Sequence, residues 1–170
     1  MERLWAPWRL EYVSAAADSV EPGGCVFCAA LDPERRSPLL LYQGERFFII
    51  LNKFPYNNGH LMVVPTRHVG RLVDATTAEL HEMIALTRTA EMALTEAYQA
   101  HGINVGMNLG RSAGAGVLGH MHVHLVPRWD GDTNFMSVVG HTRVVPEAPD
   151  ASVARLRPIF EKLRLSAQGR

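Results

Sequence analysis

The chain has 170 residues, of which 47% are apolar and 20% are charged, a balance typical of a globular domain. Its 17 basic and 17 acidic residues cancel, so no net field attracts nucleic acid or an anionic membrane, and we expect neither as a partner. The sequence shows no apolar run near the roughly 20 residues that span a bilayer, and its tryptophan- and proline-containing start is unlike a secretory signal, which predicts a cytoplasmic protein.

The first candidate site in chain order is a pair of cysteines, Cys25 and Cys28, which follow a stretch of mostly small residues over positions 14–24. In a reducing compartment, two cysteines at this spacing indicate a metal or redox site more than a structural disulfide. A structural zinc needs four ligands, so the pair alone does not make a site. Two reduced thiols in a turn are the alternative.

Strands are predicted where β-branched and apolar residues lie between turn signals, over residues 39–42, 46–51, 60–65, 103–109, 120–127 and 137–145. A capping box formed by Thr76 and Glu79 opens a long helix that ends at His101-Gly102. A shorter amphipathic helix is predicted over residues 150–165. Hairpin-like strands with one long helix predict an α+β domain built on an antiparallel sheet.

Three histidines alternate with apolar residues in the segment that precedes Pro127, at positions His120, His122 and His124. In a strand, side chains at this spacing share one face, about 7 Å apart, whereas on a helix they would diverge. The intervening residues then share the opposite face and can pack into a core: Met121, Val123 and Leu125. Solvated histidines, a His-x-His metal site that activates water, and nucleophilic attack by imidazole are the three interpretations.

A glycine-rich loop leads into the histidine segment and contains Gly110, Gly114, Gly116 and Gly119. Glycines permit close backbone approach and leave N–H groups free to face an anion. Asn108 and Ser112 can add hydrogen bonds from their side chains. Glycine-rich loops are often only turns, but one that feeds a three-histidine strand indicates a phosphate-binding loop.

The run His-Met-His-Val-His-Leu-Val resembles the motif of the histidine triad (HIT) family. A second block, residues 51–65, resembles the family's upstream segment, in which Gly59-His60 enters a strand. The tail over residues 127–135 is similar to the branch of fragile-histidine-triad-like hydrolases and bacterial diadenosine tetraphosphate phosphorylases. The resemblance implies a HIT-like α+β fold with a sheet of about five strands, one long helix and a C-terminal helix. It implies a single domain over residues 1–170, with a core over 25–130 between two extensions, 1–24 and 131–170.

The resemblance also implies a mechanism. His122 would attack the α-phosphorus of a nucleotide and form a nucleotidyl-histidine, and His124 would bind the phosphate and its bridging oxygen. His120 would orient His122, and His60 would join the cluster. Imidazole suits this role because it is both a good nucleophile and a good leaving group. The implied nucleotide contacts are Asn52 at the ribose, Ile50 and Met62 at the base, and Asn108, Ser112 and Gly114 beside the phosphate.

A metal site is implied by the same resemblance, because some family members complete the cysteine pair with two histidines. The matching positions are Cys25, Cys28, His68 and His120. We therefore expect one structural zinc per chain, no organic cofactor, and a homodimer. If zinc is bound, His120 is a support rather than an acid or base.

The leading hypothesis for activity is a nucleotidyl hydrolase or transferase that cleaves dinucleoside polyphosphates, with water or phosphate as the acceptor. A purine nucleoside phosphoramidate hydrolase is the alternative enzyme. A nucleotide-sensing module with little turnover is the alternative that is not an enzyme. The presence of His122 argues against a pure binder, because binding needs no nucleophile.

Overall fold

The computed structural model describes residues 24–133 and 147–168. The predicted extension up to residue 23 and the candidate strand over residues 137–145 lie outside the described residues. Within the described ranges, no helix is both long and apolar enough to cross a bilayer.

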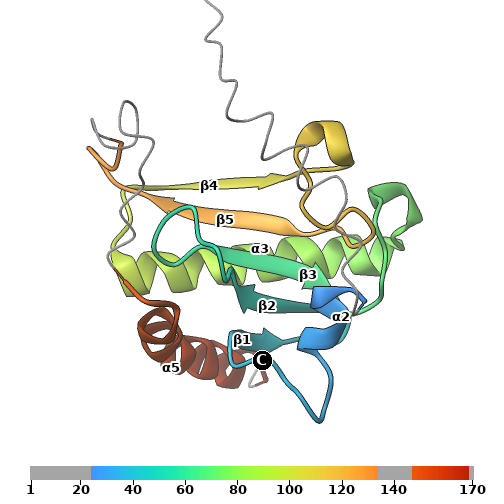
Figure 1. Ribbon diagram of the computed structural model, residues 1–170. Helices are drawn as coiled ribbons and strands as arrows, with labels where there is room; N and C mark the ends of the chain where they lie inside the picture. The colour runs from blue at the N-terminus through green and yellow to red at the C-terminus, as the bar shows by residue number, and fades with distance from the viewer. Residues whose placement is uncertain (1–23, 134–146, 169–170) are drawn as a thin grey trace, which may run out of the picture.

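The described strands are β1 (Leu40–Gln43), β2 (Phe47–Leu51), β3 (Leu61–Pro65), β4 (Gly102–Met107) and β5 (Val123–Arg128). They form a five-stranded sheet in the order β1-β2-β3-β5-β4, in which every neighbouring pair is antiparallel (Figure 1). The prediction of an α+β fold on an antiparallel sheet of about five strands is confirmed.

The described helices are α2 (Val26–Ala30), η1 (Leu72–Asp74), α3 (Thr77–Tyr98), η2 (Arg111–Ala113) and α5 (Pro149–Gln168). The predicted capping box is present at the start of α3, where Thr76 and Glu79 bond to each other's backbone N–H. The prediction that His101-Gly102 ends this helix is wrong. Gln99 adopts a left-handed conformation with φ 48° and bonds to the carbonyl of Thr95, which leaves Gly102 to begin β4.

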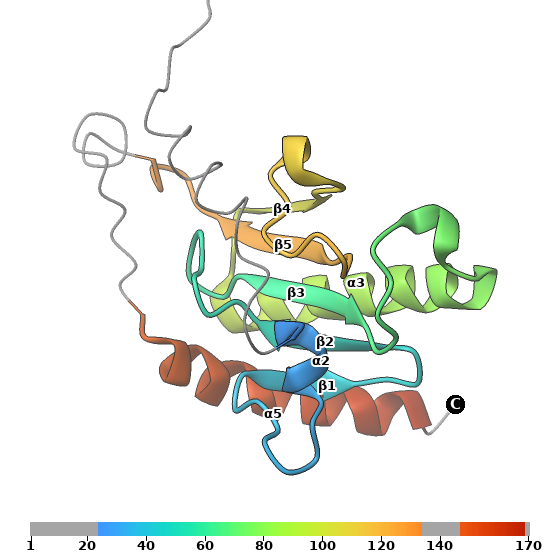
Figure 2. The same ribbon diagram turned by 45° about the vertical axis from the view of Figure 1, so that its right-hand side comes forward.

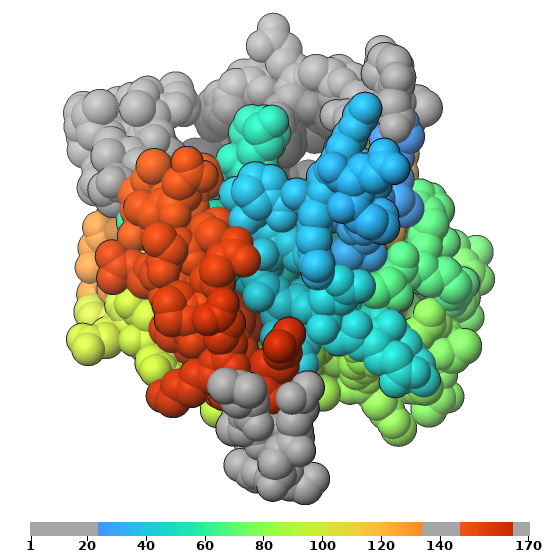
Figure 3. All heavy atoms as spheres, turned by 90° about the horizontal axis from the view of Figure 1, so that it is seen from below, coloured from blue at the N-terminus to red at the C-terminus, as the bar shows by residue number. Residues whose placement is uncertain are grey.

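The two faces of the sheet are covered to different extents. On one face, α3 and α5 pack against the sheet and enclose the larger core, which includes Phe47, Ile49, Leu61 and Leu125. In Figure 1, α3 passes behind the strands and α2 lies in front of them, and Figure 2 shows the same layers after a turn. Seen from below, α5 lies beside the β1–β2 region (Figure 3). Among the described residues, α2 is the one helix that covers the front face of the sheet, and it is short.

The side chains of the histidine segment alternate between the two faces as predicted. The prediction that the strand begins at residue 120 is wrong. The hydrogen-bonded ladder of β5 begins at Val123, because the N–H of Met121 bonds instead to the carbonyl of Val69 at 2.8 Å. Met121 and Val123 nevertheless pack into the core on the α3 side. Residues 120–122 thus form a lead-in to the strand rather than part of its ladder.

Candidate active site and metal centre

The three alternating histidines become more exposed along the chain. His120 is 0% exposed and His122 is 5% exposed, whereas His124 is half-buried. The ring of Phe27, from α2, covers the buried end, with its centroid 5.4 Å from that of His120 and 5.0 Å from that of His122. The rings of His122 and His124 lie with centroids 4.7 Å apart. We call His120, His122 and His124 the histidine row. Its buried end, at His120, is the closed end, and its more exposed end, at His124, is the open end.

His122, in the middle of the row, has a defined tautomer. Its Nδ1 lies 3.0 Å from the carbonyl oxygen of His120, and a carbonyl can only accept, so Nδ1 carries the proton. The lone pair is then on Nε2. Burial lowers the pKa of His122, so the ring is neutral at neutral pH. Neutral imidazole with a free Nε2 is the form that can act as a nucleophile.

His124, at the open end, has the opposite tautomer because of a chain of hydrogen bonds that begins at the backbone. The N–H of Tyr56 donates to Nδ1 of His60 at 3.1 Å, which puts the proton of His60 on Nε2. That Nε2–H donates to Nδ1 of His124 at 2.9 Å, so the proton of His124 is on its Nε2. His124 therefore offers an N–H where His122 offers a lone pair.

Burial keeps this pair of rings neutral. Burial first, and then the neighbouring His124 and His122 rings, lower the pKa of His60 to about 3. Burial, followed by the influence of His122, lowers the pKa of His124 to about 4. Since both rings are uncharged near pH 7, the direction of the hydrogen bonds between them is set by the amide of Tyr56 and not by a charge.

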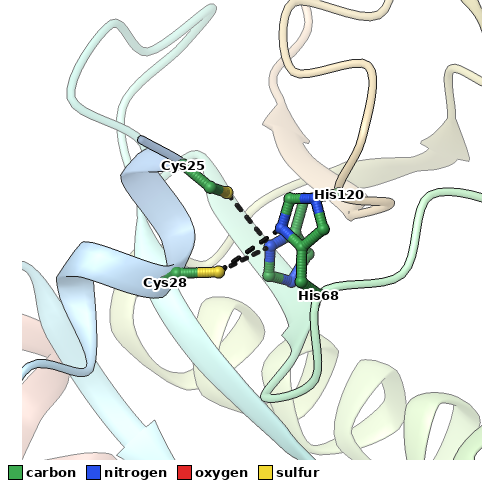
Figure 4. A group of neighbouring side chains, drawn as sticks. All are labelled: Cys25, Cys28, His68 and His120. Atoms are coloured by element: carbon green, nitrogen blue, oxygen red, sulfur yellow. Dashed lines mark hydrogen bonds between the residues drawn. The ribbon is translucent and has the colours of Figure 1, made fainter. Parts of the chain in front are cut away.

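The four predicted metal ligands lie together at the closed end of the row (Figure 4). Their donor atoms, Sγ of Cys25 and Cys28 and Nδ1 of His68 and His120, all lie within 4.8 Å of one another. Three of the sulfur–nitrogen distances are 3.2, 3.4 and 3.6 Å. Tetrahedral zinc with ordinary bond lengths separates such donors by about 3.5 Å, so the set fits this ion. These residues could hold a metal.

The other ring nitrogen of His120, Nε2, also supports a metal site at these four residues. Its Nε2 lies 2.8 Å from the carbonyl oxygen of Pro65, so Nε2 carries the proton and Nδ1 presents a lone pair to the sulfur atoms. A metal-bound histidine usually donates its other N–H to such an acceptor, which fixes the ring. Metal binding at Nδ1 would also leave the carbonyl of His120 free to accept from His122.

Two features that the sequence did not indicate hold His68 in place. A Cβ atom on Gly119 would lie 2.9 Å from Nε2 of His68, so this position of the glycine-rich loop serves close packing. Arg67 forms two bonds of 2.9 Å with the carboxylate of Glu79, from Nε and Nη2. Glu79 is the acidic residue of the capping box, so the start of α3 is tied to the residue next to His68.

The predicted ribose and base contacts lie beside the row on neighbouring strands. Ile50 of β2, Met62 of β3 and His124 of β5 are cross-strand partners. Ile50 and Met62 are 6% and 7% exposed and belong to the cluster under α2. Asn52 lies next to His60, with Nδ2 3.3 Å from Nδ1, and its Oδ1 accepts the N–H of Phe54.

The predicted phosphate-side residues occupy the loop between β4 and β5. Nδ2 of Asn108 bonds to the carbonyl of Gly114 at 3.4 Å, and Ser112 is exposed on η2. Gly110 and Gly114 have φ of 84° and 87°, so this loop needs glycine at both positions. Asn108 and Gly114 therefore close the loop on itself, as do bonds from the N–H groups of Ala113 and Ala115 to the carbonyl of Gly110, while Ser112 stays exposed.

Comparison with known proteins gives consistent matches. The model of the HIT domain matches residues 35–131. An AP-4-A phosphorylase of Mycobacterium tuberculosis is 39% identical over 152 residues, which cover 86% of this chain and 78% of that protein. The asymmetrical bis(5′-nucleosyl)-tetraphosphatase of Schizosaccharomyces pombe is 32% identical over 93 residues, 55% of this chain and 50% of that protein.

A solved structure is similar over most of the chain. The crystal structure of a zinc-bound histidine triad family protein from Mycobacterium smegmatis aligns with a TM-score of 0.68 and 30% identity. The alignment covers 84% of this chain and 96% of that one.

Proposed function

This chain belongs to the HIT domain family, and we propose that it is a nucleotide-processing enzyme that cleaves dinucleoside polyphosphates at the α-phosphate. The similarity to an AP-4-A phosphorylase and to a bis(5′-nucleosyl)-tetraphosphatase supports this substrate class. The single observation that carries the proposal is the pair of opposite tautomers at the open end of the row. His122 has a lone pair on Nε2 and His124 has an N–H on Nε2, in rings whose centroids lie 4.7 Å apart.

In the first step, Nε2 of His122 attacks the α-phosphorus, and the bond to the bridging oxygen breaks. The product is a nucleotidyl-histidine, and the rest of the polyphosphate leaves. The positive charge that develops on the His122 ring is stabilised by the carbonyl of His120, which accepts from Nδ1. His124 donates from Nε2 to the phosphate or to the leaving oxygen. His60 holds His124 in this orientation and is a positioning residue.

In the second step, inorganic phosphate or water attacks the same phosphorus and breaks the phosphorus–nitrogen bond. Phosphate would release a nucleoside diphosphate, and water would release a nucleoside monophosphate. The neutral imidazole of His122 is restored in both cases. Splitting one displacement into two suits imidazole, which is a good nucleophile and a good leaving group near neutral pH.

We assign one structural zinc per chain to Cys25, Cys28, His68 and His120, and no organic cofactor. The ion would connect α2, which carries Phe27, to the closed end of the row. Zinc bound there supplies a fixed fold rather than a reacting group. The similarity to a zinc-bound family member supports this assignment, and elemental analysis of the purified protein tests it.

The nucleotide contacts follow the same layout. We propose that Asn52 binds the ribose hydroxyls and that Ile50 and Met62 line the base pocket. Asn108, Ser112 and Gly114 would lie on the phosphate side, where the hydroxyl of Ser112 is exposed. We also propose a homodimer in the cytoplasm; β4, at the edge of the sheet, supports pairing with a second copy.

The test is incubation of the protein with diadenosine tetraphosphate, with and without inorganic phosphate. Formation of ADP and ATP only when phosphate is present identifies a phosphorylase, and formation of AMP and ATP without it identifies a hydrolase. With substrate labelled in the α-phosphate, wild-type protein should retain label after rapid denaturation, and His122→Ala should not. Turnover that survives in His122→Ala would refute the nucleophile.

A further inference from the structure

Asp132, four residues after the end of β5, is a carboxylate that gathers hydrogen bonds from two segments of the chain. Nε and Nη2 of Arg128 donate to its two oxygens at 2.6 Å each, and the N–H of Trp129 donates to Oδ2 at 3.2 Å. The guanidinium of Arg128, and then the N–H of Trp129, hold the pKa of Asp132 well below its usual range. The side chain is 11% exposed, so an ionised carboxylate is fixed beside the end of β5.

The second segment bonded to Asp132 is the loop between β2 and β3, through the side chain of Asn57. Nδ2 of Asn57 donates to Oδ2 of Asp132 and to the carbonyl of Pro127, in β5, at 3.1 Å in both cases. Both partners can only accept, so the amide nitrogen must face them. The paired residues of β3 and β5 run as far as Leu61 and Leu125. Asn57 therefore attaches the loop to β5 beyond the last of these pairs.

The residue before Asn57 supplies the N–H from which the hydrogen bonds to His124 begin. The N–H of Tyr56 donates to Nδ1 of His60 at 3.1 Å, and the N–H of His60 donates to the carbonyl of Asn57 at 3.2 Å. The main chain at Tyr56 and Asn57 thus faces His60 from two sides. Because Asn57 is bonded to β5, the N–H of Tyr56 is held in place relative to the strand that carries His124.

Asn52 is a second donor to His60, and it is held separately from Asn57. Its Nδ2 lies 3.3 Å from Nδ1 of His60, and its backbone N–H bonds to the carbonyl of His60 at 2.9 Å. The ribose contact proposed for Asn52 uses the same side chain, whereas the N–H of Tyr56 has His60 as its acceptor. Loosening the loop at Asn57 should therefore disturb the proton of His124 and spare the ribose contact.

We propose that Asn57 and Asp132 are positioning residues of the reaction. Asp132 holds the side chain of Asn57 on β5, and this attachment holds the N–H of Tyr56 against His60. The two residues act through His60, which donates to Nδ1 of His124 at 2.9 Å and leaves the proton of His124 on Nε2. The inference rests on the proposed cleavage of dinucleoside polyphosphates and deepens it, because it assigns the support of the proton donor.

The experiment measures kcat and KM for diadenosine tetraphosphate in wild type, Asn57→Ala, Asp132→Ala, Asp132→Asn and the double variant with alanine at both positions. Asn58→Ala is the matched control, since Asn58 is the same residue type one position later and its Oδ1 has no hydrogen-bond partner among the described residues. The nitrogen-15 shifts of His124 are recorded by NMR with AMP bound, and they report which ring nitrogen carries the proton without any turnover. Denaturant unfolding checks that each variant is folded under the assay conditions.

Asn57→Ala and Asp132→Ala should each lower kcat about tenfold and change KM less than about twofold, because a displaced proton donor slows the chemical step. The double variant should be no slower than Asn57→Ala, since the two residues act along one path. Asp132→Asn keeps an oxygen that can accept from Asn57 and should lose less than Asp132→Ala. The shifts should show the proton of His124 on Nε2 in wild type and Asn58→Ala, and shared between both nitrogens in Asn57→Ala.

Three results would overturn the positioning pair and leave the proposed activity standing. They are an unchanged kcat in Asn57→Ala, losses that multiply in the double variant, and a lower kcat with the wild-type shifts of His124. The last result would mean that the loss comes from a general weakening of the loop. Wild-type protein that does not cleave diadenosine tetraphosphate would overturn the proposed function and this inference with it.

Discussion

The two ends of the histidine row fix the protons of their histidines in opposite ways. At the closed end, the carbonyl of Pro65 accepts from Nε2 of His120, which leaves the lone pair on Nδ1. At the open end, the N–H of Tyr56 donates into His60, and His60 donates to His124, which leaves the proton on Nε2. A carbonyl at one end thus prepares a metal ligand, and an amide at the other prepares a hydrogen-bond donor.

The difference teaches that the backbone at the two ends of β3 sets the proton positions of histidines in β5 and in the segment just before it. Pro65 is the last residue of β3, and His60 directly precedes its first. His122, between them, depends on its own segment, since its Nδ1 bonds to the carbonyl of His120. Three identical side chains are thus prepared for the three proposed roles of metal ligand, nucleophile and hydrogen-bond donor, because a different group faces each one: the carbonyl of Pro65, the carbonyl of His120 and the ring of His60. Each prediction below changes one end and leaves the other in place.

The largest effect is expected from loss of the metal at the closed end. Cys28→Ser removes one of four donors, and we expect the zinc content to fall from one per chain to near zero. The free energy of unfolding should fall by at least about 3 kcal/mol, a fraction of the binding free energy of structural zinc. Elemental analysis and denaturant unfolding measure the two quantities. Ala29→Ser, which adds a hydroxyl on the neighbouring exposed position, is the control and should retain both.

If Cys28→Ser unfolds like wild type and binds as much zinc, the four residues are not the metal centre. Chelation of wild-type protein provides a check without a substitution. It should reproduce the stability of Cys28→Ser and should have no effect on the variant itself.

The second-largest effect is a loss of kcat when the hydrogen bonds at the open end are changed. His60→Leu fills the same buried space but cannot donate to Nδ1 of His124, so the tautomer of His124 is no longer fixed. We expect kcat for diadenosine tetraphosphate to fall about 10²-fold, the range of a correctly placed proton donor, with zinc content unchanged. His60→Gln is the control, because its side-chain amide can donate from nearly the same position, and it should lose much less activity. Equal loss in both variants would show that His60 fills space and does not orient His124.

The third effect is a pH dependence of the free energy of unfolding, which arises from the histidines at the open end. The pKa values of His60 and His124 are lowered by burial to about 3 and about 4, whereas the unfolded chain has histidines near 6.5. Between these values the unfolded state binds more protons than the folded state, so stability is present above pH 6.5 and is lost as the pH falls toward 4. Each ring contributes a slope of up to about 1.4 kcal/mol per pH unit. Denaturant unfolding at pH 7, 6 and 5 should show a shallower loss in His60→Gln than in wild type. Parallel curves would contradict the pKa assignment.

Much of this site could be predicted from the sequence because its ligands and strands obey short-range rules. The period of two in the histidine segment predicted which side chains face the core, and Met121 and Val123 do pack there. The capping box predicted the start of α3 from Thr76 and Glu79 alone. The spacing of Cys25 and Cys28, joined with the resemblance to a family, indicated the two histidines that lie beside them.

The sequence could not predict the features that depend on contacts distant in the chain. The tautomer of His120 depends on Pro65, which is 55 positions away. The start of β5 depends on a bond from Met121 to Val69, and no local pattern marks it. No local pattern marks Tyr56, whose contribution appears only when its N–H meets Nδ1 of His60. Gly119 was interpreted as part of an anion-binding loop, but its position against His68 shows that it is also needed for packing.

The smallest effect is expected from the support of His68, which belongs to the closed end only. Arg67 and then the backbone and hydroxyl of Thr76 lower the pKa of Glu79 to about 2, so the Arg67–Glu79 pair is charged at all working pH values. The side chain of Arg67 is 51% exposed, so solvent screens the pair, and Arg67→Met should lower the free energy of unfolding only slightly. Because Arg67 directly precedes His68, zinc affinity should fall about tenfold, as for other groups that orient a ligand.

Arg46→Met is the matched control for this last prediction. Arg46 also pairs with a glutamate of α3, Glu82, at 3.5 Å, but it lies next to β2 rather than next to a metal ligand. We expect it to lose a similar small stability and to keep the zinc affinity of wild type, as measured by competition with a chelator. If both variants weaken zinc equally, the effect comes from the general stability of α3. If only Arg67→Met does, the salt bridge acts on His68, and the closed end needs a side-chain support in addition to backbone groups, as the open end needs His60 in addition to the amide of Tyr56.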